Sequence, residues 1–98
     1  MPDIRHVVIH HPGPCWQADV PLFEQEGLQA HVEHYRQLLA QGKLALGGPF
    51  LDAAAGGMMI PEPGLSEDEI RAFAQADPAI ASGLLTFELR QWMVGMQA

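Results

Sequence analysis

Apolar and polar residues alternate near both ends of the chain and repeat with a helical period between them. Residues 4–10 and 84–94 carry β-branched or aliphatic side chains at alternate positions, which is typical of strands. Two short apolar runs, at residues 43–50 and 58–60, lie beside glycine pairs. Each of these runs predicts a further strand.

The segment between about residues 23 and 41 has the periodicity of an amphipathic helix. Its apolar positions follow one another at steps of four, three and four residues: Leu28, Val32, Tyr35 and Leu39. Gly27 weakens the beginning of this segment, so a regular helix is expected from about that residue. Gly42 is suited to end it, because glycine readily adopts the left-handed conformation of a helix C-terminus.

A second helix is predicted after Ser66, which is followed three residues later by Glu69 in the spacing of a capping box. Its apolar face comprises Ile70, Phe73 and Ala74. Pro78 ends it, and Asp77 with Pro78 has the pattern of an N-cap followed by the first residue of a short helical turn that Gly83 closes.

The resulting order, β-α-β-β-α-β, is that of a ferredoxin-like α+β fold, with an antiparallel four-stranded sheet and both helices on one face. The length fits a single domain over residues 1–98. Apolar residues occupy both faces of the strands, as Val7 and Ile9 do against Val8. We therefore expect two copies to pair through their sheets as a homodimer.

Charge argues against some partners. The chain has 5 basic and 12 acidic residues, a formal charge of −7, and its acidic residues are dispersed apart from residues 67–69. Nucleic acids and anionic membrane surfaces require clustered Lys and Arg, so neither is an expected partner.

Cys15 is the one cysteine, which excludes an intrachain disulfide and favours a reducing, cytoplasmic setting. It lies in a Pro/Gly loop with no helix N-terminus to activate the thiol, so it is not expected to be a nucleophile. No targeting leader and no apolar run of transmembrane length is visible, and we expect neither secretion nor membrane insertion.

Two polar residues stand where an apolar one is expected: His31 and Asp77 each fall on the core-facing side of a predicted helix. A buried histidine and carboxylate need partners, and together they can form a proton-transferring pair. The alternatives are structural. His31 can be satisfied by a backbone carbonyl, and Asp77 can serve as a helix cap, although a carboxylate has oxygens for both roles.

The predicted topology brings one end of each element together, and this end holds His10 and His11, His31, residues 47–49 and Asp77. His6 and His34 are less well placed. His31 and His34, with His10 or His11, could bind a metal, but adjacent strand residues face opposite ways and no metal motif accompanies them. No metal is expected. Residues 47–49 lack the features of a phosphate loop, although glycine there would allow a ligand to approach the backbone.

The order of several short motifs resembles the YCII-related (YciI-like) family over roughly residues 4–94. The matching positions are His31, Leu38-Leu39, Gly42-Lys43-Leu44, Gly47-Gly48-Pro49, Asp52, Gly56-Gly57, Ser66, Asp77-Pro78, Gly83-Leu84 and Arg90-Gln91-Trp92. The resemblance implies a dimeric α/β barrel and an active site on His31 and Asp77. Many members carry arginine three residues before the histidine, where this chain has Leu28. That difference removes an anion-binding charge and argues against an acidic group on the substrate.

Members of the family with an assigned reaction suggest lyase chemistry on hydroxylated rings, such as dehydrochlorination, and the fold resembles that of muconolactone isomerases. We therefore expect a cofactor-independent lyase or isomerase acting on a small cyclic or aromatic molecule. His31 is the expected acid/base, and Asp77 orients it. Residues expected to contact the substrate are Gly48, Pro49, Trp16, Tyr35 and His10, with His10 or His11 as a second proton carrier. The alternative is a non-catalytic dimeric module that binds a small ligand or is associated with stress.

Overall fold

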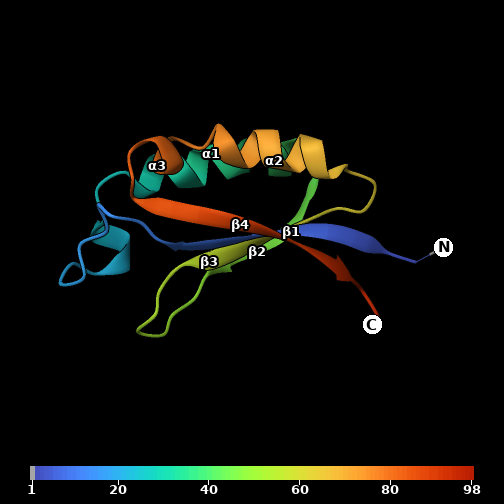
Figure 1. Cartoon of the computed structure of the whole chain (residues 1–98), viewed down its shortest axis with the longest axis horizontal. Coiled ribbons are helices and arrows are strands. Elements are labelled where there is room, and N and C mark those ends of the chain that lie inside the picture. The colour runs from blue at the N-terminus through green and yellow to red at the C-terminus, as the bar shows by residue number, and fades with distance from the viewer. Residues whose placement is uncertain (1) are drawn as a thin grey trace.

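Four antiparallel strands form one sheet in the computed structural model, which describes residues 2–98 (Figure 1). The strands lie in the order β2-β3-β1-β4. Their bounds are β1 Ile4–Pro12, β2 Leu44–Pro49, β3 Gly57–Pro61 and β4 Leu85–Met93. This arrangement confirms the predicted ferredoxin-like α+β fold.

The helices cover one face of the sheet (Figure 1). They are the α-helices α1 Leu28–Ala40, α2 Glu67–Gln75 and α3 Pro78–Ala81, whereas η1, a 3-10 turn at Leu22–Glu24, precedes α1 and lies beyond the end of the sheet. The helix predicted from about residue 23 is thus divided, because Gly27 has a positive φ of 93° and begins α1 as its N-cap. Within residues 2–98, no helix has the length and apolar character needed to cross a bilayer.

The core lies between the sheet and the helices. One apolar cluster joins Val8 of β1 to Ile70 and Ala74 of α2. A second joins Tyr35 and Leu38 of α1 to Leu44 of β2, and a third joins Ala79 of α3 to Leu84 and Leu85. Since side chains alternate along a strand, the position two residues after Val8 also faces the helices. That position is His10.

One predicted core residue is placed wrongly by the periodicity. Leu39 is 53% exposed, whereas its neighbour Leu38 is 4% exposed and belongs to the core. The helix face that packs on the sheet runs through His31, Tyr35 and Leu38, at steps of four and three residues. The rotation of α1 therefore points His31 directly at the sheet.

The face of the sheet away from the helices holds a shallow hollow with apolar walls. It is lined by Val7, Ile9, Met58, Ile60 and Trp92, together with Arg90 and Gln91. Trp92 and Met58 are exposed there. The pairing of two copies through this face stays a prediction.

Gly56 holds the β2–β3 connection against β1. It has a positive φ of 80°, and a Cβ atom at this position would overlap the carbonyl oxygen of His10. Gly42, with a φ of 73°, has open space around the same position. The two glycines therefore share a backbone conformation but differ in their surroundings.

We predict that Gly56→Ala destabilises the protein by about 1–3 kcal/mol more than Gly42→Ala, because only the former must displace β1 at His10. Gly42→Ala should show only the conformational cost of a left-handed alanine, about 1–2 kcal/mol. Urea denaturation of the two variants measures both values. Equal losses would show that the contact between Gly56 and β1 is not tight.

Candidate active site

The site is built around the carboxylate of Asp77, which is 0% exposed and lies between α2 and α3. Its Oδ1 atom accepts a hydrogen bond from the backbone N–H of Ala79, at 2.9 Å, and so caps α3. Its Oδ2 atom lies 2.6 Å from Nδ1 of His31. Asp77 therefore has both of the roles that the sequence allowed, cap and histidine partner, one on each oxygen.

His31 lies in the first turn of α1 and reaches Asp77 across 46 positions of the chain. A carboxylate can only accept, so the Nδ1–H of the imidazole donates this bond. The bond fixes the ring orientation and leaves Nε2 as the nitrogen available to another molecule. Because His31 lines a cavity between α1 and the sheet, a bound molecule can reach the ring.

His10 completes a buried cluster. Its ring lies edge-to-face against that of His31, with centroids 4.8 Å apart, and is 2% exposed. Burial, and then the neighbouring charge of His31, lower the pKa of His10 to about 4 despite the opposing effect of Asp77. His10 is therefore neutral at pH 7, and its 3.9 Å approach to the Asp77 carboxylate is not an ion pair under these conditions.

Tyr35 lies beside both histidine rings, and its hydroxyl is 3.5 Å from Nε2 of His10. Burial, reinforced by the negative charge of Asp77, raises the pKa of Tyr35 above its ordinary value. The hydroxyl thus keeps its proton and can donate it to the long hydrogen bond with neutral His10.

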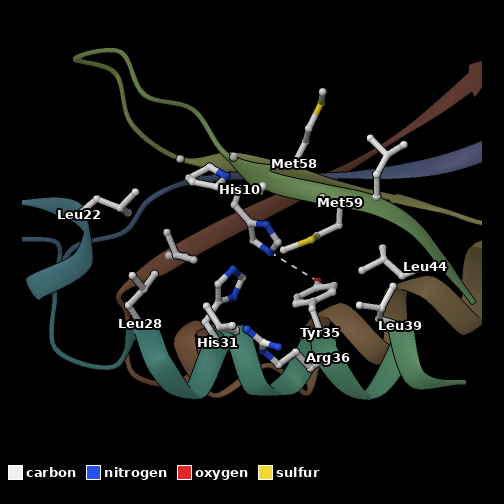
Figure 2. A pocket seen from close by; sticks show the side chains of 18 of the residues that line it. His10, Leu22, Leu28, His31, Tyr35, Arg36, Leu39, Leu44, Met58 and Met59 are labelled. Atoms are coloured by element: carbon white, nitrogen blue, oxygen red, sulfur yellow. Dashed lines mark hydrogen bonds between the residues drawn. The ribbon is translucent and has the colours of Figure 1, made fainter.

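These groups lie at one side of a cavity of about 470 Å³ between α1 and the sheet (Figure 2). Met59 points from the sheet into it, as His31 and Tyr35 do from α1. The predicted contact residues line this cavity: Trp16, Gly48, Pro49, Tyr35 and His10. Asp77 does not line it and is connected to it through the hydrogen bond with His31.

Sequence reasoning missed several lining residues, of which Arg36 is the most polar. Arg36 follows Val32 by four positions, and Val32 lies on the predicted apolar stripe of α1. Helical spacing could therefore have placed Arg36 beside the cavity. The apolar lining residues Leu22 and Phe23, by contrast, come from η1, a 3-10 turn that the hydrophobic periodicity did not predict.

The other histidines lie outside the cluster. His34 is stacked on Phe73, and its Nε2 is 2.7 Å from the carbonyl oxygen of that residue. His6 approaches Glu67, and exposed His11 approaches Glu88 on β4. His10 and His11 thus face opposite sides of the sheet, as alternation along a strand requires.

The donor atoms of His10, His31 and Asp77 all lie within 4.8 Å of one another, a spacing that could hold a metal ion. This is not the His31–His34 pair considered from the sequence, because His34 faces Phe73. A metal ion bound to Nδ1 of His31 would have to replace the proton that this atom donates to Asp77. That proton belongs to a short, charge-assisted hydrogen bond, with 2.6 Å between Nδ1 and Oδ2.

Comparison with known proteins bears on this geometry. The family model of the YCII-related domain matches residues 9–93, a range that contains His10, His31 and Asp77. The protein belongs to the YCII-related family. This YCII-related chain is also 34% identical over 70 residues to "Uncharacterized protein YjpA" of Bacillus subtilis (strain 168), covering 71% of this chain and 80% of that one. The resemblance inferred from the short motifs is confirmed, and the relative's name assigns no reaction.

For this YCII-related protein we predict that His10 remains neutral down to about pH 4, its lowered pKa. The main reason is the cost of burying a positive charge, to which the neighbouring His31 adds. Histidine ring resonances followed by NMR between pH 8 and the onset of acid unfolding test this directly. A midpoint for His10 near the ordinary histidine value, about 6.5, would contradict it.

The same shift affects stability. The unfolded chain binds a proton at His10 below about pH 6.5 and the folded chain does not until about pH 4, so stability should fall with falling pH in this window. The slope from this one group is at most about 1.4 kcal/mol per pH unit. Urea denaturation of the wild type and of His10→Gln at several pH values isolates this contribution, which the variant should lack.

Proposed function

We propose that the protein is a cofactor-independent lyase or isomerase that transfers a proton on a small cyclic or aromatic molecule. One observation carries the proposal: a fully buried carboxylate is bonded, at 2.6 Å, to an imidazole in the wall of an apolar cavity. This arrangement supplies a general base with a fixed orientation and a compensated charge.

In the proposed reaction, Nε2 of His31 removes a proton from a carbon of the bound molecule. The ring becomes an imidazolium whose Nδ1–H still donates to Asp77, so the new positive charge lies against a carboxylate. The electron pair left on carbon forms a new C=C bond. In a lyase, a leaving group departs with its own electron pair from the adjacent carbon. In an isomerase, an existing C=C bond of the substrate breaks as the new one forms, and its electron pair takes the proton back from His31 at another carbon.

The remaining groups support the position of the substrate. Trp16 and Met59 provide an apolar surface for a ring, while Gly48 lets the substrate approach the backbone of β2. Neutral His10 packs edge-to-face against His31, and its pKa of about 4 makes it a hydrogen-bonding group rather than the main base at pH 7.

A second candidate is a non-catalytic dimeric ligand-binding or stress-associated module, in which the contact between His31 and Asp77 is structural. The cap that Asp77 provides to α3 favours this candidate, because the carboxylate is needed there in any case. The two candidates predict different effects of replacing His31. If the protein is an enzyme, loss of the basic Nε2 atom abolishes most of the turnover; if it is a structural module, no ligand response changes.

A screen by thermal shift identifies small molecules that bind, and NMR in D₂O then follows exchange of their carbon-bound protons. We predict that His31→Gln lowers the rate of exchange or turnover by about 10²–10⁴-fold, the range typical of a positioned acid/base. Asp77→Asn should lower it as well, because the amide can present its N–H₂ group to His31 and disturb the ring.

His34→Gln is the matched control, since it removes a histidine of the same helix that contacts Phe73 instead of Asp77. It should retain the activity of the wild type. If His31→Gln binds the same molecules and exchanges their protons at the wild-type rate, catalysis by His31 is excluded. Loss of thermal stability alone, with no change in any ligand response, would favour the structural module.

We also propose that two copies pair through the uncovered face of the sheet. The hollow lined by Val7, Ile9 and Trp92 supplies an apolar surface of the kind that antiparallel sheets bury against a partner. Sedimentation at micromolar concentration should show a dimer, and Ile9→Glu should shift it to the monomer. A monomeric wild type would refute this pairing and leave the cavity, on the other face, unaffected.

A further inference from the structure

The cavity has one fully charged side chain in its wall. Among the residues that line it, Arg36 is the only arginine, lysine, aspartate or glutamate. Acidic side chains outnumber basic ones by 12 to 5 in the chain, yet none of the acidic ones lines the cavity. The negative charge of Asp77 lies behind His31 and is already engaged by it. The local charge of the cavity is therefore opposite to that of the protein as a whole.

Arg36 lines the same cavity as His31, and its exposed side chain lies at the rim. It follows Val32 on the cavity-lining side of α1, and helical side chains lean toward the N-terminus of their helix. Figure 2 shows the Arg36 side chain extending along α1 toward the turn that carries His31. A molecule bound against His31 can therefore present a group to the guanidinium at the rim.

The guanidinium of Arg36 is also free to bind. Three other basic side chains are engaged in ion pairs: Arg5 with Asp3 at 2.9 Å, Lys43 with Glu69 at 3.3 Å and Arg71 with Glu67 at 3.6 Å. Within residues 2–98, Arg36 and Arg90 form no such pair. Arg90 lies beside the hollow on the opposite face of the sheet, which makes it a matched reference for Arg36.

We propose that Arg36 binds the anionic group of the substrate and that this substrate is a ring carboxylate. This inference rests on the proposed function of His31. The apolar walls accept the ring, and the planar guanidinium accepts a carboxylate through two parallel hydrogen bonds. The sequence argued against an acidic substrate because Leu28 replaces the arginine of many family members. Arg36, two turns further along α1, provides a cation at a different point of the rim.

The same contact assists the chemistry. Removal of a proton from a carbon near the carboxylate places further negative charge on the substrate, and a guanidinium bound to the carboxylate stabilises that charge. A substrate without an acidic group would leave Arg36 unused at the cavity. The charge of −7 on the chain does not attract anions, so selectivity for a carboxylate depends on this local contact.

The experiment compares ring carboxylates with neutral amides of the same shape: benzoate with benzamide, and cyclohexanecarboxylate with its amide. Binding is measured by NMR titration, with the His31 and His10 ring resonances as reporters of the cavity. We expect the wild type to bind each carboxylate about tenfold more tightly than its amide, as for other charge-assisted contacts. Arg36→Gln should abolish this preference, whereas Arg90→Gln should retain it.

Equal affinities of the wild type for carboxylate and amide would overturn the assignment of Arg36, as would a preference that persists in Arg36→Gln. If the amides shift the His31 resonances and the carboxylates do not, the cavity is a ligand site of another specificity and the proposed function survives. If no probe shifts the reporters of the cavity, both proposals fail. Loss of the preference in Arg90→Gln would indicate a general effect of charge and would also overturn the assignment.

Discussion

The hydrogen bond between His31 and Asp77 is the constraint on which this site depends. A carboxylate with no exposed surface must have each oxygen satisfied, and here one oxygen caps α3 while the other accepts from the imidazole. The bond thereby connects α1 to the junction of α2 and α3 above the sheet. It also determines which nitrogen of His31 faces the cavity, so one contact links the packing of the helices to the available chemistry.

Two of the polar groups around this bond, His10 and Tyr35, are held in their neutral forms at pH 7. Burial keeps His10 neutral at pH 7, so its 3.9 Å approach to Asp77 is not an ion pair and the short hydrogen bond of Asp77 is with His31. Tyr35 keeps its hydroxyl proton for the same reason. The cavity therefore combines one histidine with an engaged carboxylate, two neutral polar groups and, at the rim, a free guanidinium. Such a set supports the proposal of proton transfer on an apolar ring that carries one negative group.

The fold could be predicted from the sequence because each strand and helix buries one side. Burial of one side produces alternation in a strand and helical spacing in a helix, and both patterns are local. The sequence also predicted that His31 and Asp77 lie at one end of the domain, because the ferredoxin-like topology brings the ends of their elements together. The Asp77-Pro78 pair predicted the helix cap. The rotation of α1 could not be predicted from the sequence, because Leu38 and Leu39 are equally apolar and only packing on the sheet shows which of them is buried. Arg36 was missed because a charged residue at a helix surface normally faces solvent, and its position beside a cavity depends on how β2 and η1 pack around α1, which the helical periodicity does not predict.

The most direct test of the account is the tautomer of His31, read from the ¹⁵N chemical shifts of its ring in a long-range ¹H–¹⁵N NMR spectrum above the pH at which the ring is protonated. The account predicts a proton on Nδ1, held by Asp77, and an unprotonated Nε2 facing the cavity, with the Nδ1 preference lost in Asp77→Asn. A proton on Nε2 in the wild type, or a ring that exchanges freely between both tautomers, would contradict it.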